Sequence, residues 1–237
     1  MTRNFRRWAG CALAVAVLAT TAACAEGSYG VGYIVGRRGE SGAFTPTPPT
    51  PPPPPSPTRP APADLPNETH SGNGDATVPI SWPSDQPGFV TFECPKCVSN
   101  VFMNTDGDEI SLVNAIGSYR GTHWINMSLH AHRPTRTLTI RANSAWTVTI
   151  ADARSLPVAE PGKELSGKAE SVLKIPAGVT KAAVAASGDF HFALWVTTES
   201  SSRLVVNQRP PYRNTIPVDG PGYVQVEAAA NWTFTAS

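Results

Sequence analysis

Beyond Arg3, Arg6 and Arg7 near its start, this chain has no cluster of basic residues, and charged residues of either sign are scarce. Only 16% of the 237 residues are charged, and 19 lysines and arginines nearly balance 18 aspartates and glutamates. Binding to nucleic-acid phosphates requires grouped lysines and arginines. The sequence therefore excludes nucleic acid as a partner.

Motifs for catalysis and for cofactor binding are also missing. The chain contains neither a Gly-x-Ser-x-Gly nucleophile turn nor a His-Glu-x-x-His zinc motif. Its glycine pairs at Gly30-Val-Gly32 and Gly36-Arg-Arg-Gly39 lack the flanking strand and helix of a phosphate-binding loop. We therefore expect a non-enzymatic protein without a cofactor.

A long apolar run is lacking as well. The apolar residues 11–19 are too few to span a membrane as a helix, and they follow Arg3, Arg6 and Arg7. A charged start before a short apolar core is typical of an export signal. We predict that residues 1–23 are a signal peptide.

The residues that follow, Thr21-Ala22-Ala23-Cys24, resemble the lipobox of bacterial lipoproteins, with Thr21 in place of the usual leucine. The resemblance implies cleavage after Ala23 and attachment of palmitate-type acyl chains to Cys24. Two or three such chains anchor a protein stably, whereas one is marginal. The alternative is an ordinary signal peptide cut near Ala25, with Cys24 lost. The resemblance places the protein outside the cytoplasm, lipid-anchored to the outer face of the cytoplasmic membrane.

Proline is concentrated in one place. Residues 24–71 begin Gly-rich and continue with a proline-rich run over 45–66. Proline fixes φ and removes the amide donor, so this run is expected to be polyproline II, with a reach of roughly 60 Å at ~3.1 Å per residue. We predict a disordered stalk that holds the following domains clear of the membrane. The alternative is a ligand for a proline-recognition domain.

From residue 72 onward, short β-rich runs alternate with turn residues, and no long stretch keeps a helical period. The clearest alternation puts Ile125 and Met127 on one strand face and Trp124 and Asn126 on the other. The strands expected in the first unit are 76–80, 88–93, 98–104, 109–114, 122–130, 136–142 and 145–151. In the second unit, the residues expected to point inward are Phe190, Phe192, Leu194, Val196, Val224, Val226, Ala228, Trp232 and Phe234.

The β-rich part is a repeat. Asn114, Tyr119 and Arg120 recur as Asn207, Tyr212 and Arg213 in the same spacing. Ser71-Gly72 precedes the first copy as Ser166-Gly167 precedes the second, and Trp146 and Trp232 close the two copies. We predict an all-β chain with two tandem antiparallel β-sandwiches of jelly-roll or Greek-key type, over 72–152 and 166–237, joined by a connector over 153–165.

The duplicated pattern resembles one found in secreted and lipid-anchored actinobacterial proteins whose β-sandwich domain is uncharacterised. The residues that carry the resemblance are Phe102, the Asp106-Gly107 turn, the segment 112–121 (Leu-Val-Asn-Ala-Ile-Gly-Ser-Tyr-Arg-Gly) and the segment 142–148 ending in Trp-Thr-Val. The second copy departs from the pattern, with Gln208-Arg-Pro-Pro211 in place of the Ile-Gly step. The resemblance implies a fold and a location but no activity.

Cys94-Pro-Lys-Cys97 has three interpretations: a disulfide, half of a zinc site, or a redox pair. A redox pair requires a following helix, and zinc requires more ligands, for which His130 and His132 are the candidates. A disulfide requires only an oxidising compartment, which the export signal supplies. We predict the disulfide and no metal site.

Two further patterns remain. Residues 104–109 contain Asp106 and Asp108 in a fragment of a calcium loop, for which a hairpin turn is the expected structure. Trp124 and Trp195 lack counterparts in the repeat and are predicted by strand parity to point outward. They define a candidate ligand face. The alternative is that the two rings cover a contact between the units or pack under a loop. The residues of this face are Trp124, Asn126, His130, His191 and Trp195.

Three hypotheses for function follow. The first is a non-enzymatic cell-envelope lipoprotein that binds or scaffolds something in the cell wall, its partner a glycan or an envelope protein. The second is a carbohydrate- or peptidoglycan-binding module. The third is a metal-handling or redox lipoprotein that uses Cys94, Cys97 and the nearby histidines.

The anchoring hypothesis makes a direct prediction. Cys24→Ala removes the acylation site, so the protein is expected to leave the membrane fraction for the medium or to keep its leader. Cell fractionation with intact-mass measurement checks this. An unchanged mass together with unchanged membrane association contradicts it.

Overall fold

The computed structural model describes residues 64–127, 133–189, 191–198 and 201–237. Cys24, His130, His132 and Phe190 lie outside this part of the chain. The regular secondary structure of the described residues is β-strand, as predicted, apart from one short 3₁₀ helix (η1, Ala153–Ser155). None of the described helices is long and apolar enough to cross a membrane.

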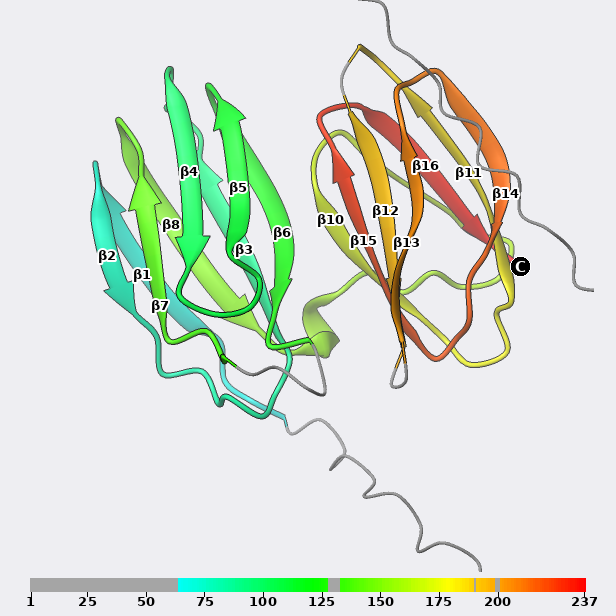
Figure 1. Cartoon of the computed structure of the whole chain (residues 1–237), viewed down its shortest axis with the longest axis horizontal. Helices are drawn as coiled ribbons and strands as arrows, with labels where there is room; N and C mark the ends of the chain where they lie inside the picture. The colour runs from blue at the N-terminus through cyan, green and yellow to red at the C-terminus, as the bar shows by residue number, and fades with distance from the viewer. Residues whose placement is uncertain (1–63, 128–132, 190, 199–200) are drawn as a thin grey trace, which may run out of the picture. The chain divides into compact units, whose positions relative to one another are not determined.

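The first unit contains eight strands in two antiparallel sheets (Figure 1). One sheet has the order β1-β8-β3-β6 and the other β2-β7-β4-β5. The strands are β1 (Glu68–Asn73), β2 (Ala76–Pro79), β3 (Gly88–Cys94), β4 (Asn100–Thr105), β5 (Ser111–Ile116), β6 (Tyr119–Ile125), β7 (Thr137–Arg141) and β8 (Ala145–Ala151).

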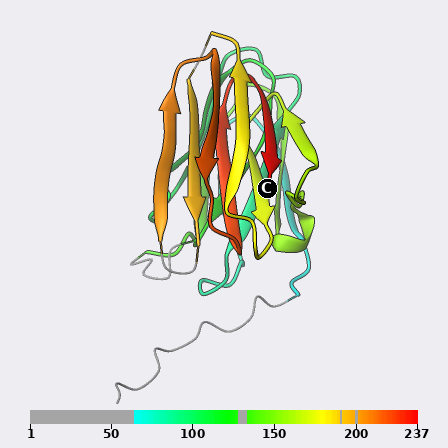
Figure 2. The ribbon, with the colours of Figure 1, turned by 90° about the vertical axis from the view of Figure 1, so that its right-hand side faces the viewer.

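The second unit repeats this order strand for strand, as β9-β16-β11-β14 and β10-β15-β12-β13. In the side view its strands run next to one another along one direction (Figure 2). The strands are β9 (Glu164–Gly167), β10 (Ser171–Ile175), β11 (Lys181–Ser187), β12 (Phe192–Thr197), β13 (Ser202–Gln208), β14 (Tyr212–Pro217), β15 (Gly222–Ala228) and β16 (Asn231–Ala236). Two packed four-stranded sheets in this order form a jelly roll, so the predicted tandem sandwiches are confirmed.

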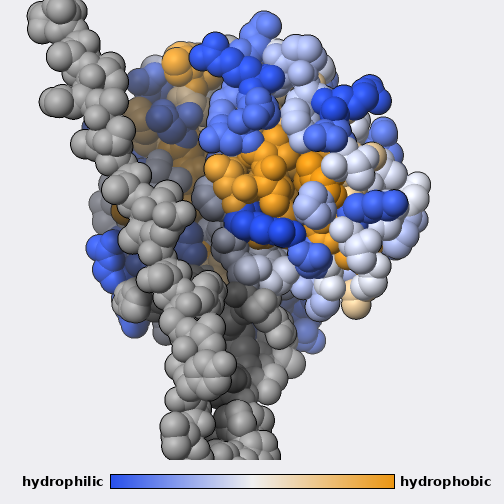
Figure 3. All heavy atoms as spheres, turned by 45° about the vertical axis from the view of Figure 1, so that its right-hand side comes forward, coloured by the Kyte–Doolittle hydropathy of each residue, from blue (hydrophilic) through white to orange (hydrophobic). Residues whose placement is uncertain are grey.

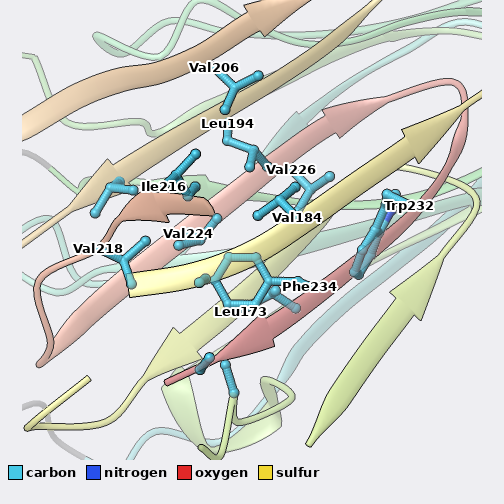
Figure 4. Packing of buried hydrophobic residues seen from close by; sticks show 14 of the residues in the cluster. Leu173, Val184, Leu194, Val206, Ile216, Val218, Val224, Val226, Trp232 and Phe234 are labelled. Carbon is cyan, nitrogen blue, oxygen red and sulfur yellow. The ribbon is translucent and has the colours of Figure 1, made fainter. Parts of the chain in front are cut away.

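Each unit has its own core, built by alternate residues of facing strands. In β8, Trp146, Val148 and Ile150 are buried, while Thr147 and Thr149 between them are partly exposed. In the second unit, Trp232 and Phe234 of β16 point into a core shared with residues such as Leu194 (Figure 4). This period of two is the pattern that a half-buried antiparallel strand requires.

The closing tryptophan of each unit lies across a glycine of the unit's first strand. Trp146 is paired with Gly72, and Trp232 with Gly167. A Cβ on either glycine would overlap the indole ring, so no larger residue fits there. The indole Nε1 donates to the carbonyl of Gly74 at 2.8 Å in the first unit and to that of Ala169 at 2.9 Å in the second. The repeated Ser-Gly and Trp positions of the sequence therefore form the same indole–glycine contact in both units.

The duplication extends to an irregularity of the backbone. The pairing of β4 with β5 shifts register between Met103 and Asn104, and that of β12 with β13 shifts between Leu194 and Trp195. A β-bulge inserts one extra residue into one strand of an antiparallel pair. The extra residues here are Leu112 and Val205, and Leu112 turns into the core of its unit.

The structure corrects two predicted boundaries. β1 lies across the expected end of the stalk at residue 71, and β9 across the expected end of the connector at residue 165. Both are edge strands without apolar alternation, fixed by their pairing with β8 and β16. The strand expected over 122–130 ends at Ile125, because Asn126 has a φ of 55° and leaves the extended conformation.

The indole–glycine contacts predict the effect of a single methyl group. Gly72→Ala and Gly167→Ala each force a Cβ into the indole ring, and we expect each to lower the free energy of unfolding by about 1–3 kcal/mol. Urea denaturation checks this, with Ser71→Ala as the matched control on the adjacent exposed residue. If the glycine variants unfold at the urea concentration of the wild type, the indole is not held as described.

Candidate functional site

The predicted ligand face around Trp124 lies where the two units meet. Trp124 of β6 and Phe89 of β3 are buried in an apolar cluster with Val172 of β10, and Trp195 and Tyr223 pack against it. Only 8% of Trp124 is exposed. The alternation of side chains along the strand correctly predicted that Trp124 points away from the core of its own unit. The second unit, however, covers Trp124. The expectation of an exposed Trp124 is therefore wrong, and the alternative, a contact between the units, is what the structure shows.

The other members of that predicted face do not form one surface either. Asn126 is 1% exposed, and its Oδ1 accepts a hydrogen bond from the amide of Thr135 at 2.8 Å. Trp195 is partly buried against the cluster, while His191 is exposed just before β12. His130 lies outside the described residues. Asn126 thus has a structural role, since its side chain joins the end of β6 to Thr135.

Polar contacts accompany the apolar cluster between the units. The amide of Thr122 donates to the carbonyl of Glu170 at 3.1 Å, and the amide of Trp124 donates to Oε1 of Gln225 at 3.3 Å. The rings of Phe89 and Tyr223 pack with their centroids 5.2 Å apart. The outer face of β3 and β6 thus meets the outer face of β10, β12 and β15.

A buried polar group lies beside this junction. The Tyr119 hydroxyl is 2.8 Å from Nε2 of His123, and Tyr119 also forms a hydrogen bond with the Glu170 carboxyl of the second unit. Burial raises the pKa of Tyr119 and that of Glu170, and it lowers the pKa of His123 to about 4. His123 is therefore neutral at pH 7. The group links the two units through the side chains of Tyr119 and Glu170.

The segment that enters the first unit is fastened to the connector between the units. The amide of Leu65 donates to Oδ2 of Asp152 at 3.0 Å, and Nη2 of Arg154 donates to the carbonyl of Leu65 at 3.1 Å. Hydrogen bonds from the Arg154 side chain hold the pKa of Asp152 down at about 2. Asp152 also accepts from the Arg154 amide and so caps η1. We call the contacts among Leu65, Asp152 and Arg154 the clasp.

Cys94 and Cys97 form the predicted disulfide, with their Cα atoms 5.5 Å apart. Both are buried at 0% and 3% exposure, and the Cys97 amide closes a turn on the Cys94 carbonyl at 3.3 Å. No group of three or more histidines, cysteines, aspartates or glutamates suited to a metal occurs among the described residues. The candidate ligands His130 and His132 are not among them.

The fragment of a calcium loop at 104–109 is a hairpin turn. Oδ1 of Asp106 accepts hydrogen bonds from the amides of Arg136 and Thr137, both at 2.9 Å. The Glu109 carboxylate accepts from the amides of Asn126 and Met127. These carboxylates stabilise the turn and the loop beside it, as the hairpin interpretation predicts.

An open face that the sequence analysis did not identify lies on the other sheet of the first unit. Phe102 of β4 points outward and is half-buried, and it is paired with Asn114 of β5 and Arg141 of β7. Asn100 and Asn104 lie on the same face, two residues before and after Phe102. We call these five residues the Phe102 face. A signal was present in the sequence, where Asn100, Phe102 and Asn104 alternate with the apolar Val101 and Met103.

No family model matches the chain, and no curated protein matches it. Two of the solved structures similar to it are the CUB1-EGF-CUB2 domain of human MASP-1/3 and the stem and receptor-binding domain of the spike protein P1 of bacteriophage PM2. The first has 7% identity and a TM-score of 0.25, covering 72% of this chain and 99% of that one. The second has 10% identity and a TM-score of 0.13, covering 74% of this chain and 80% of that one.

The buried His123 predicts an acid-sensitive stability. The folded pKa of about 4 lies below the unfolded value of about 6.5, so the unfolded chain binds more protons between these values. The contribution of His123 to stability is therefore complete above pH 6.5 and falls by up to about 3 kcal/mol toward pH 4.

Denaturation of wild type and His123→Gln at pH 4–8 isolates this contribution from that of Glu170, whose raised pKa acts in the opposite direction. The difference in unfolding free energy between the two proteins is expected to shrink as the pH falls. A difference that stays constant with pH would show that His123 titrates normally.

The disulfide predicts a modest effect on stability. The double variant Cys94→Ser/Cys97→Ser is expected to fold and to lose about 2 kcal/mol, because the bond closes a very short loop. Intact mass with and without reductant, followed by urea denaturation, measures both points. Two free thiols in freshly isolated protein, or zinc removed by a chelator, would favour the metal interpretation.

Proposed function

We propose that this protein is a non-enzymatic lipoprotein of the cell envelope that displays two joined jelly rolls for binding or scaffolding in the cell wall. Cys24 carries the acyl anchor at the outer face of the cytoplasmic membrane, and the proline-rich stalk that precedes β1 provides reach. The partner is a cell-wall glycan or an envelope protein. The uncharacterised lipid-anchored actinobacterial proteins that the sequence resembles provide the context.

One observation carries the binding role. The β2-β7-β4-β5 sheet of the first unit and the β10-β15-β12-β13 sheet of the second are equivalent in strand order. In the second unit, the outer face of this sheet contributes Val172, Trp195 and Tyr223 to the contact with the first unit. The equivalent face of the first unit carries exposed polar side chains around Phe102. The same surface thus mediates docking in one copy and is open in the other.

The carbohydrate-binding alternative is favoured by the Phe102 face, because an aromatic ring among amide groups suits a sugar. The metal or redox alternative has less support. Both cysteines are used in the disulfide, and a disulfide does not supply the thiolate ligands that zinc requires. A strand and not a helix follows the pair, and both cysteines are buried, whereas a redox pair requires a following helix and access to solvent. The hydrogen-bonded carboxylates of Asp106 and Glu109 are likewise occupied in stabilising a turn.

Co-sedimentation of the detergent-purified full chain with membrane-free cell-wall sacculi tests the proposal. We expect saturable binding by the folded protein and none by protein unfolded beforehand. Crosslinking in intact cells then identifies whether the captured partner is a glycan or a protein. If the protein neither binds sacculi nor captures an envelope partner, the proposal fails.

A further inference from the structure

The Phe102 face has the composition of a ligand-binding surface. Phe102 lies at its centre, opposite Asn114 on one side and Arg141 on the other, and directly paired residues have Cβ atoms about 4.5–5.5 Å apart. Asn100 and Asn104 extend the face along β4 over about 14 Å, at ~3.4 Å per residue. The result is an elongated strip with an aromatic ring at its midpoint.

The polar groups of the strip are not used within the protein. Asn100, Asn104, Asn114 and Arg141 are exposed. Among the described residues, none of these four side chains forms a hydrogen bond or an ion pair. This differs from the remainder of the same unit, where the carboxylates of Asp106 and Glu109 and the amide of Asn126 hold turns in place. Three amides and one guanidinium are therefore free to bind a ligand.

The chemistry of these groups favours a polysaccharide with acidic sugars. A ring can stack on the apolar face of a pyranose, and amide groups donate to and accept from hydroxyl groups. The planar fork of arginine matches a carboxylate in two parallel hydrogen bonds. The strip contains no acidic residue to oppose an anion.

A protein partner fits this surface less well. A stable protein interface buries about 800 Å² on each side around an aromatic or apolar centre. The strip offers one half-buried ring, with the exposed Ile116 opposite Asn100 at one end, and its neighbours on β7 are Thr137 and Thr139. A narrow polar strip with one ring suits an extended chain of sugars better than a second folded surface.

The second unit provides an internal comparison. There Asn207 of β13 occupies the position of Asn114, with the bulge in the same place. Ala193 replaces Phe102, and Glu227 replaces Arg141. At these two positions the copy whose face is covered by the other unit lacks both the ring and the guanidinium, and it has Trp195 at the position of Asn104. These two groups occur together only on the copy that is open.

We propose that the Phe102 face binds an extended polysaccharide that carries acidic sugars, with Phe102 stacking on a pyranose, the three asparagines contacting hydroxyls and Arg141 pairing with a carboxylate. This inference deepens the proposed function and rests on it for the biological setting. It names the chemical class of the partner and the residues that contact it.

Native affinity electrophoresis of the detergent-purified full chain tests this directly. The gels contain polygalacturonate, hyaluronan or, as the neutral comparison, hydroxyethylcellulose. We expect retardation by at least one acidic polymer and weaker retardation by the neutral one. Phe102→Ala and Asn114→Ala are each expected to weaken binding about tenfold, which corresponds to about 1.4 kcal/mol. Arg141→Gln is expected to remove the preference for the acidic polymers.

Asn207→Ala is the matched control, because it removes the same side chain at the equivalent position of the second unit and should bind like wild type. Circular dichroism and urea denaturation establish that each variant is folded. The inference is overturned if neither acidic polymer retards the protein, or if folded Phe102→Ala and Asn114→Ala bind like wild type. Equal binding to neutral and acidic polymers would overturn the role of Arg141.

These outcomes are distinguishable from a failure of the proposed function. Saturable binding to sacculi that Phe102→Ala leaves unchanged would retain the envelope role and reject this face as its site. Retardation in the gels without any binding to sacculi would retain the face and reject the envelope role.

Discussion

The stacking of an indole on a glycine holds each jelly roll closed. β8 and β16 are the last strands of their units, yet each lies between the unit's first and third strands. Trp146 and Trp232 reach from these strands across Gly72 and Gly167 and donate to a carbonyl just beyond them. The contact therefore joins the two ends of each unit. It also explains why edge strands with so little apolar character as β1 and β9 are held in register.

The two units differ on the surface through which the first unit contacts the second. If the second unit had the same apolar surface there, it could bind a further copy in the same way. Phe89 and Trp124 make the first unit's contribution to the contact between the units. By register, Lys181 and Pro217 occupy the equivalent positions in the second unit. A lysine and a proline on the outer face discourage further sheet packing. Figure 3 shows one face of the molecule, on which a patch of hydrophobic residues (orange) is surrounded by hydrophilic residues (blue).

The sequence was sufficient to predict the elements that have a strong apolar period. β8 and most strands of the first unit lie within a few residues of their predicted positions, and Trp232 and Phe234 of β16 point inward as predicted. The repeat made Trp146 and Trp232 equivalent positions, and both are core residues. β1 was missed because its alternation is between exposed and half-exposed polar residues. Its position depends on pairing with β8, which lies far along the chain and leaves no local signal.

The sites were harder to predict for a related reason. The alternation of residues along a strand predicts on which face of the sheet a side chain lies. It does not predict which other part of the protein covers that face. Trp124 was placed on the correct face and was nevertheless buried by the second unit. Phe102 was overlooked because one phenylalanine among asparagines resembles an ordinary exposed strand until β5 and β7 bring Asn114 and Arg141 beside it. The disulfide was predictable because the two cysteines are local in sequence.

The clasp has a mechanical consequence. Any load that reaches the described part through the N-terminal segment arrives first at Asp64 and Leu65. Asp64 is paired with Arg154, and Leu65 is tied to Arg154 and to Asp152 at the start of the connector. Part of the force is therefore delivered between the units before it acts along β1. The six residue pairs that join β1 to β8 follow the clasp along the chain, so they bear load only after it. A tether attached in this way must break the clasp before it can peel β1 away from β8.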